Sequence, residues 1–68
     1  MRELPIKGEA IRLGQLLKLA GLVDSGSDAR PLLETESVFV NGEVETRRGR
    51  QLVRGDVVSL DGEEVRIA

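Results

Sequence analysis

The sequence contains no cysteine and no histidine, and each absence excludes a class of protein. Without cysteine, neither a disulfide framework nor a thiolate metal site can hold the fold. Without histidine, the chain lacks the most common general base, the usual zinc ligands and every serine–histidine or cysteine–histidine pair. Its 12 carboxylates are best interpreted as surface charge. We therefore predict a protein that is not an enzyme and that binds neither a metal nor another cofactor.

Aromatic residues and long apolar runs are also scarce. Phe39 is the only aromatic residue, and no apolar run approaches the roughly 20 residues that cross a bilayer. Residues 1–5 lack the apolar core of a signal peptide. We therefore predict a soluble, cytoplasmic protein that binds no membrane. With 68 residues the chain allows one small domain, residues 1–68, which we expect to be a monomer without a small-molecule substrate.

The charges are unevenly distributed, although the net charge is only −2. Residues 24–46 carry one arginine against six acids, whereas residues 47–55 carry four arginines and no acid. Net charge governs long-range steering, but a local cluster of this kind governs direct contact with an anion. The charge pattern therefore directs attention to the second half of the chain.

Two short helices are predicted in the first half. Apolar residues at positions 13, 16, 17 and 20 have helical spacing, which predicts a helix over 12–20 that ends at Gly21. Gly14 weakens this helix by about 0.5–1 kcal/mol relative to alanine. Ser25 and Asp28 have the spacing of a capping box, which predicts a second helix over 26–35. Pro31 would lie beyond the first turn, so this helix either kinks or becomes regular later.

The other segments alternate with the period of strands. A short strand is predicted near Leu4 and Ile6, and the intervening proline confines it to a sheet edge or to the start of a strand. Two hairpins are predicted over 38–45, turning at Asn41-Gly42, and over 57–67, turning at Asp61-Gly62. Phe39 points away from its strand neighbours. It could stack on a base, but we expect it to be covered by the second hairpin. A strand, two helices and a small antiparallel sheet place the chain in the α+β class.

The segment between the hairpins, residues 46–55, is here called the connector. It carries Arg47, Arg48, Arg50 and Arg54, whose guanidinium groups can reach phosphates without disturbing the core. The planar fork of arginine suits bidentate phosphate contact and stacking on bases. On spacing alone, the alternative is that these arginines form ion pairs with Glu43, Glu45 and Asp56 on a solvated face.

Several short motifs occur in a fixed order along residues 11–60. They are Ile11-Arg12-Leu13-x-x-Leu16-Leu17, Gly21-Leu22-Val23-x-Ser25, Ala29-Arg30, Val38-x-Val40-Asn41-Gly42 and Gly55-Asp56-Val57-Val58-Ser59-Leu60. This ordered set resembles the RNA-binding domain named after small-subunit ribosomal protein four, also called the alpha-L RNA-binding motif. The full length is similar to that of its small, stand-alone bacterial members. The resemblance implies two helices packed on a small, strongly bent sheet, with RNA lying across the helices and the adjacent loops.

The resemblance also implies a set of binding residues. Arg12, Ser25, Arg30 and Asn41 match the motif, whereas Arg47, Arg48 and Arg50 match the basic loop of the small members. Together with Lys18 and Arg54, these residues form the predicted RNA-binding set. The predicted partner is a structured RNA, with ribosomal RNA as one candidate.

The sequence departs from the usual pattern of this family at four positions. Gly14 replaces a common acid, and Gly26 and Pro31 replace positions that are often basic. Glu36 stands where a glycine usually precedes the Val-x-Val strand, so the second helix must end without the residue that adopts a left-handed conformation most easily. These departures thin the basic surface of the helices. We therefore expect the connector arginines to contribute more to binding than Arg12 and Arg30.

Two other functions are compatible with parts of the sequence. A protein-interaction module of the same fold would bind an acidic partner surface through the same arginines. A beta-grasp sulfur carrier shares the Val-Asn-Gly and Gly-Asp-x-Val signals, but it needs a C-terminal Gly-Gly. Because this sequence ends in Arg66-Ile67-Ala68, the sulfur carrier is nearly eliminated.

Overall fold

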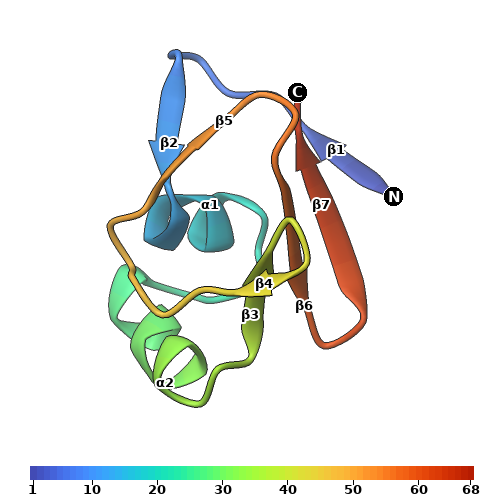
Figure 1. Ribbon diagram of the computed structural model, residues 1–68. Helices are drawn as coiled ribbons and strands as arrows, with labels where there is room; N and C mark the ends of the chain where they lie inside the picture. Colours follow the sequence, from blue (N-terminus) through green and yellow to red (C-terminus); the bar gives the residue numbers. More distant parts are fainter.

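The computed structural model describes residues 1–68, apart from the surroundings of Gly26. Figure 1 shows short strands and helices in the following order along the chain: β1 (Arg2–Leu4), β2 (Ala10–Arg12), α1 (Leu13–Leu19), the 3₁₀ turn η1 (Gly26–Asp28), α2 (Ala29–Glu34), β3 (Val38–Val40), β4 (Glu43–Val44), β5 (Gln51–Val53), β6 (Val57–Leu60) and β7 (Glu63–Ile67). The predicted α+β class is confirmed. Within the described chain, no helix is long and apolar enough to span a membrane.

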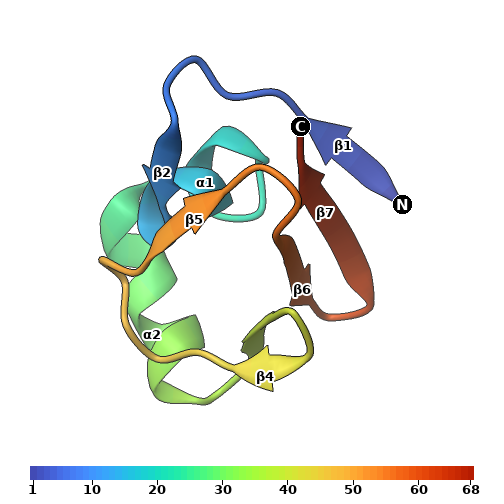
Figure 2. The same cartoon turned by 45° about the horizontal axis from the view of Figure 1, so that its top comes forward.

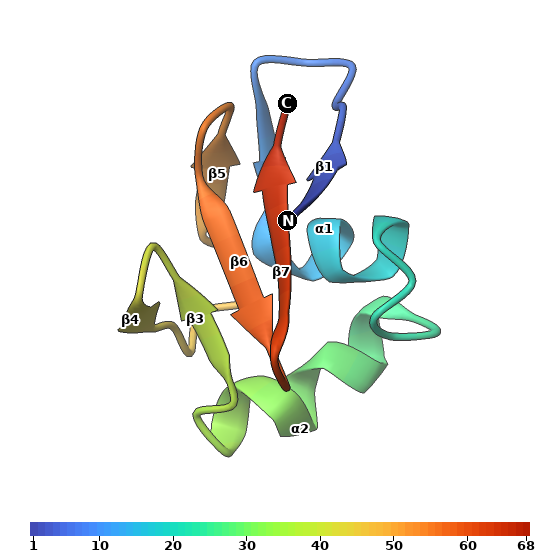
Figure 3. The same cartoon turned by 90° about the vertical axis from the view of Figure 1, so that its right-hand side faces the viewer.

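In the described part of the chain, five strands form one sheet in the order β1-β7-β6-β3-β4. Neighbouring strands are antiparallel, except that β1 runs parallel to β7, which makes the sheet mixed. The strand β1 occupies an edge of the sheet, one of the two places predicted, but it ends before Pro5 and does not include Ile6. Figure 3 shows this first strand beside the last one, so the two ends of the chain belong to the same part of the sheet.

Both helices lie on the same side of this sheet (Figures 1 and 3). Val38 and Val40 of β3 face the helices and are buried, whereas Phe39 between them is 37% exposed. The core is completed by leucines of α1 and α2 and by inward residues of β6 and β7. Phe39 pairs across the sheet with Ser59 of the second hairpin. The Phe39 side chain stays partly exposed, so the expected coverage by the second hairpin is wrong in extent.

The second helix begins later than predicted. The segment 26–28 forms the 3₁₀ turn, and the Ser25 hydroxyl pairs with the Ser27 hydroxyl at 3.0 Å. The N-cap residue of α2 is Asp28, which makes no side-chain capping hydrogen bond, so the predicted capping box is wrong. Pro31 becomes the third residue of α2, where a backbone N–H has no acceptor within the helix. The proline therefore removes no helical hydrogen bond.

Both predicted hairpins are confirmed. Asn41 and Gly42 have φ angles of 52° and 85°, and Asp61 and Gly62 have angles of 49° and 82°, as their turns require. The connector, by contrast, contains a strand that the prediction missed. β5 pairs with β2 in a separate two-stranded ribbon, which Figure 2 shows next to α1. The connector is therefore anchored to the segment that leads into α1.

Candidate functional site

A buried carboxylate organises the first half of the connector. Glu45 is 5% exposed, and its Oε2 atom accepts hydrogen bonds from the backbone N–H groups of Thr46 (3.1 Å) and Arg47 (3.0 Å). The Arg47 Nε atom donates to the same oxygen at 3.1 Å, and Arg50 Nη1 donates to Oε1 at 2.8 Å. Hydrogen bonds from Arg47 and then Arg50 lower the pKa of Glu45 from 4.5 to about 2. Glu45 is therefore ionised at neutral pH.

Glu45 divides the connector arginines into two groups. Arg47 and Arg50 are ion-paired with it, so the alternative interpretation of ion pairing is confirmed for this acid. The described contacts include no arginine partner for Glu43 or Asp56. Arg48 lies between the two paired arginines, and within the described chain its guanidinium has no hydrogen-bond acceptor.

The connector backbone also holds the beginning of α1. The N-cap residue Arg12 makes no side-chain capping hydrogen bond. Instead, the Leu13 N–H donates to the Arg50 carbonyl at 2.9 Å, and the Gly14 N–H donates to the Arg48 carbonyl at 3.0 Å. These bonds satisfy two of the N–H groups that have no partner inside a helix. They also fix Arg48 directly beside the first turn of α1.

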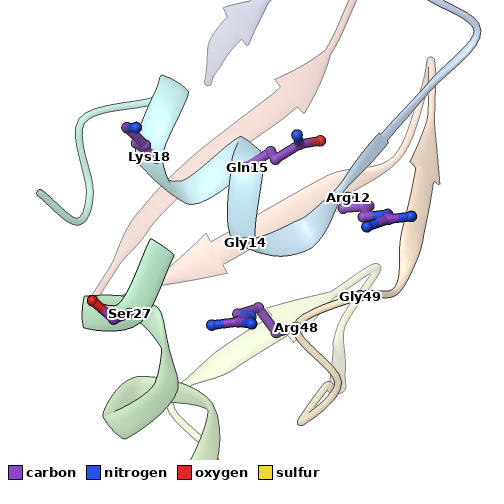
Figure 4. A pocket seen from close by; sticks show the side chains of 7 residues that line it. All are labelled: Arg12, Gly14, Gln15, Lys18, Ser27, Arg48 and Gly49. Carbon is purple, nitrogen blue, oxygen red and sulfur yellow. The ribbon is translucent and has the colours of Figure 1, made fainter. Parts of the chain in front are cut away.

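An open cleft of about 450 Å³, here called the basic cleft, lies between Arg48 and α1. Figure 4 shows Arg12 and Lys18 along the α1 side of this cleft and Arg48 next to Gly14. The complete lining consists of Arg12, Gly14, Gln15, Lys18, Ser27, Arg48 and Gly49. It thus contains three cations and no carboxylate, in a chain whose net charge is −2. The cleft is therefore a positive surface with polar groups between the charges.

A second, smaller depression adjoins the first and shares Arg48 with it. Arg30 and Glu34 of α2 also line it, and their side chains form an exposed ion pair with 3.1 Å between Nε and Oε1. Exposed pairs of this kind contribute little to stability. Arg30 consequently flanks the basic cleft on the α2 side, with Arg48 between the two helices.

The family model described as "S4 domain" matches residues 4–68 of the chain. The chain belongs to the S4 domain family. This result confirms the family that the ordered motifs of residues 11–60 resembled.

Two relatives of this S4 domain have comparable lengths. The "Probable ribosome maturation protein RlbA" of Bacillus subtilis (strain 168) is 49% identical over 57 residues, which cover 84% of this chain and 80% of the relative. The "Putative RNA-binding protein YbcJ" of Escherichia coli (strain K12) is 39% identical over 57 residues, which cover 84% of this chain and 81% of the relative.

The solution structure of YbcJ from Escherichia coli is similar over the whole S4 domain. The match has a TM-score of 0.75 at 35% identity and covers 100% of this chain and 87% of that chain. That structure is described as revealing an alphaL motif involved in RNA-binding. The similarity confirms the alpha-L arrangement of two helices and a small sheet.

The S4 fold brings only part of the predicted binding set together. Arg12, Lys18 and Arg48 line the basic cleft, Arg30 flanks it, and Ser25 is hydrogen-bonded to the lining residue Ser27. Arg54 lies elsewhere and donates to the Ile6 carbonyl at 3.0 Å. Asn41 also lies outside the cleft, because its side chain joins Asp56 Oδ1 (3.0 Å) and the Val57 N–H (2.9 Å).

Two polar residues of the basic cleft, Gln15 and Ser27, were missed in the sequence, and Glu45 was named there only as an ion-pair partner. Gln15 could have been found, because Arg12, Gln15 and Lys18 recur every three residues and form a polar face opposite the leucines of α1. Ser27 had no such signal, since the turn that presents it was taken for regular helix. That Glu45 is buried and holds both Arg47 and Arg50 depends on tertiary packing. In the sequence it resembles any acid at the end of a strand.

Proposed function

We propose that this S4 domain is a non-catalytic RNA-binding protein and that the basic cleft is its binding surface. In this proposal Arg12, Lys18 and Arg48 contact phosphates, and Arg30 extends the surface toward α2. Gln15 and Ser27 lie between the cations and supply hydrogen-bonding groups for riboses or bases. Arg47 adds an exposed guanidinium edge beside the cleft, because its side chain is 73% exposed even when paired.

The observation that carries the proposal is that cations from two distant parts of the chain, the α1 segment and the connector, line the same cleft. Arg12, Lys18 and Arg48 line one open cleft from which carboxylates are absent among the described lining residues. A positive cleft of this kind attracts and contacts a polyanion even when the net charge is slightly negative. The cleft is also open to solvent rather than enclosed, which suits a nucleic-acid backbone better than a small metabolite.

The charge state of Glu45 supports a binding role rather than a catalytic one. With a pKa of about 2, this buried carboxylate holds no proton that it could transfer near neutral pH. The chain also contains no histidine or cysteine that could act as base or nucleophile. An acid–base reaction would therefore need another carboxylate, and none is among the residues that line the basic cleft.

The names of the relatives direct the choice of RNA. One relative is named a probable ribosome maturation protein, and another a putative RNA-binding protein. We therefore propose a structured RNA as the ligand, with fragments of ribosomal RNA as the first sequences to test. The 2′-hydroxyl groups and accessible minor groove of such RNA suit short polar side chains between cations.

The proposal is tested with two variants that change the charge equally. Arg48→Gln removes a cation from the basic cleft, whereas Arg66→Gln removes one from β7, outside the cleft. Affinity for a fluorescein-labelled ribosomal RNA hairpin is measured by anisotropy, with a DNA hairpin of the same sequence as a comparison. A lost charge-assisted phosphate contact is worth roughly 1.5–3 kcal/mol, so Arg48→Gln should weaken binding at least tenfold.

The control variant should bind RNA within about twofold of the unmodified protein, because a single distant charge is largely screened at physiological salt. Equal losses in the two variants would show that only net charge matters and would contradict a site in the cleft. Binding that is insensitive to both substitutions, in folded proteins, would contradict the proposed surface altogether.

A further inference from the structure

We infer that Gly14 is a positioning residue, whose missing side chain creates the seat in which Arg48 lies across the first turn of α1. This inference rests on the proposed function of the basic cleft and deepens it, because it identifies what determines the place of its central cation. Gly14 itself is buried, although its neighbours on the cleft side are exposed.

The first argument is steric. A Cβ atom placed on Gly14 would lie 2.6 Å from Cγ and 3.2 Å from Cδ of Arg48. These are atoms of the aliphatic stem, close to the connector backbone rather than at the mobile end of the side chain. The carbonyl oxygen of Arg48 would remain at an ordinary 3.6 Å. Any larger residue at position 14 must therefore push the Arg48 side chain out of its seat, while the backbone can stay in place.

The second argument is that the connector backbone cannot follow the side chain. The Gly14 N–H is bonded to the Arg48 carbonyl, and the Leu13 N–H is bonded to the Arg50 carbonyl. On the other side, Glu45 holds Arg47 and Arg50 through their side chains. Because the backbone is fixed on both sides of Arg48, a displaced side chain has to change its rotamer and leave the cleft.

The third argument is the cost of glycine at this position. A helix with glycine at an interior position is less stable than the same helix with alanine. Gly14 is not among the glycines with positive φ, so its backbone has an ordinary helical conformation. Backbone conformation therefore gives no reason for a glycine here. The contact with Arg48 does give one, and Arg48 lines both the basic cleft and the adjoining depression.

A double-mutant cycle separates this role from general stability. The variants are Gly14→Ala, Arg48→Ala and the two combined, and each is measured with the RNA hairpin and by thermal unfolding without RNA. Gly14→Ala should weaken RNA binding at least threefold in the unmodified background and should have no further effect once Arg48 is alanine. Gly8→Ala is the matched control, because a Cβ there lies 3.8 Å from its nearest neighbour, the Ala10 carbonyl, and outside the cleft.

Thermal unfolding provides a readout that does not depend on RNA. With the Arg48 stem removed, Gly14→Ala should raise the melting temperature by roughly 2–8 °C, the gain expected from better helix propensity. With Arg48 present, the same change should leave the melting temperature unchanged or lower it. If Gly14→Ala alone fails to fold but the combined variant folds, the alanine is harmful only when the Arg48 side chain is present. That result also supports the proposed seat.

The failures of the two proposals are distinguishable. If Arg48→Ala weakens binding while Gly14→Ala binds and melts like the unmodified protein, the positioning role is wrong and the RNA site stands. Equal effects of Gly14→Ala in both backgrounds would also overturn the positioning role. If Arg48→Ala binds RNA normally, the proposed site itself is wrong, and with it the role of Gly14 in binding.

Discussion

Glu45 shows how one side chain can assign different roles to neighbouring arginines. Its carboxylate accepts bonds from the side chains of Arg47 and Arg50 and from two backbone N–H groups. The two paired arginines thereby fix the shape of the connector, and Arg48 between them is left to face the cleft. Binding surfaces are most effective when their cations are held in place before the ligand arrives.

The depressed pKa of Glu45 predicts how stability depends on pH. Its folded-state pKa of about 2 lies below the ordinary value of 4.5, so its stabilising contribution is complete above about pH 4.5. This contribution is lost as the pH falls from there to about 2, because the unfolded chain then binds more protons. Glu45→Gln should lower the melting temperature by several degrees at about pH 7 and should remove most of this acid dependence.

Thermal unfolding between about pH 7 and about pH 3 measures the effect. Glu43→Gln is the control, because Glu43 is an exposed acid on the neighbouring strand without an ion pair in the described contacts. An acid dependence that is equally steep in Glu45→Gln and in the unmodified protein would show that other carboxylates dominate.

At the scale of elements, the two helices end in the same way on very different residues. α1 is followed by Gly21 with φ of 74°, and α2 by Glu36 with φ of 58°. In each case the next N–H reaches back to the third-last helical carbonyl, from Leu22 to Leu17 (2.9 Å) and from Ser37 to Leu32 (3.0 Å). This is the Schellman arrangement, which favours glycine at the left-handed position. Glu36 therefore adopts the left-handed conformation at a position where glycine is the usual residue.

This comparison predicts that Glu36→Gly stabilises the protein. Relief of the left-handed strain is worth about 1–2 kcal/mol and outweighs the extra entropy of glycine in the unfolded chain, about 0.5–1 kcal/mol. A net gain of roughly 0.5–1 kcal/mol raises the melting temperature by about 2–8 °C. Gly21→Ala, at the equivalent position of α1, should lower it. A lower melting temperature for Glu36→Gly would indicate that the Glu36 side chain makes a compensating contribution.

The elements that the sequence predicted well are those with local causes. The two hairpins follow from Asn41-Gly42 and Asp61-Gly62, because two-residue turns select residues that tolerate positive φ. The strand β5 has no local signal, since its three residues lie in an arginine-rich segment and pair with β2 about 40 positions earlier. The start of α2 was misplaced for a related reason. A serine and an acid at capping-box spacing also fit a 3₁₀ turn, and only packing distinguishes the two.

The candidate site shows the same limit at the scale of the whole molecule. The sequence predicted Arg12, Lys18 and Arg48 as members of a longer set of binding residues. It could not separate Arg48 from Arg47 and Arg50, because that separation depends on the buried position of Glu45. The expectation that the connector outweighs the helices also assumed independent surfaces. In the structure Arg48 lies against α1, so the connector and the helix form one cleft.

The final prediction concerns how a chain with a net charge of −2 would bind RNA under the proposed function. If the cleft makes the phosphate contacts, the position of a cation matters more than the total charge. Arg12→Gln combined with Arg48→Gln and Lys7→Gln combined with Arg66→Gln both change the net charge from −2 to −4. The first pair removes two cations from the cleft, whereas neither Lys7 nor Arg66 lines it.

Each phosphate contact contributes roughly 0.7–0.9 to the slope of log affinity against log salt. The cleft variant should therefore lose roughly 1.4–1.8 from this slope, while the control keeps the slope of the unmodified protein. Anisotropy titrations of the RNA hairpin over a series of salt concentrations measure both slopes. Parallel lines for the two variants would show that overall charge, rather than the cleft, controls binding.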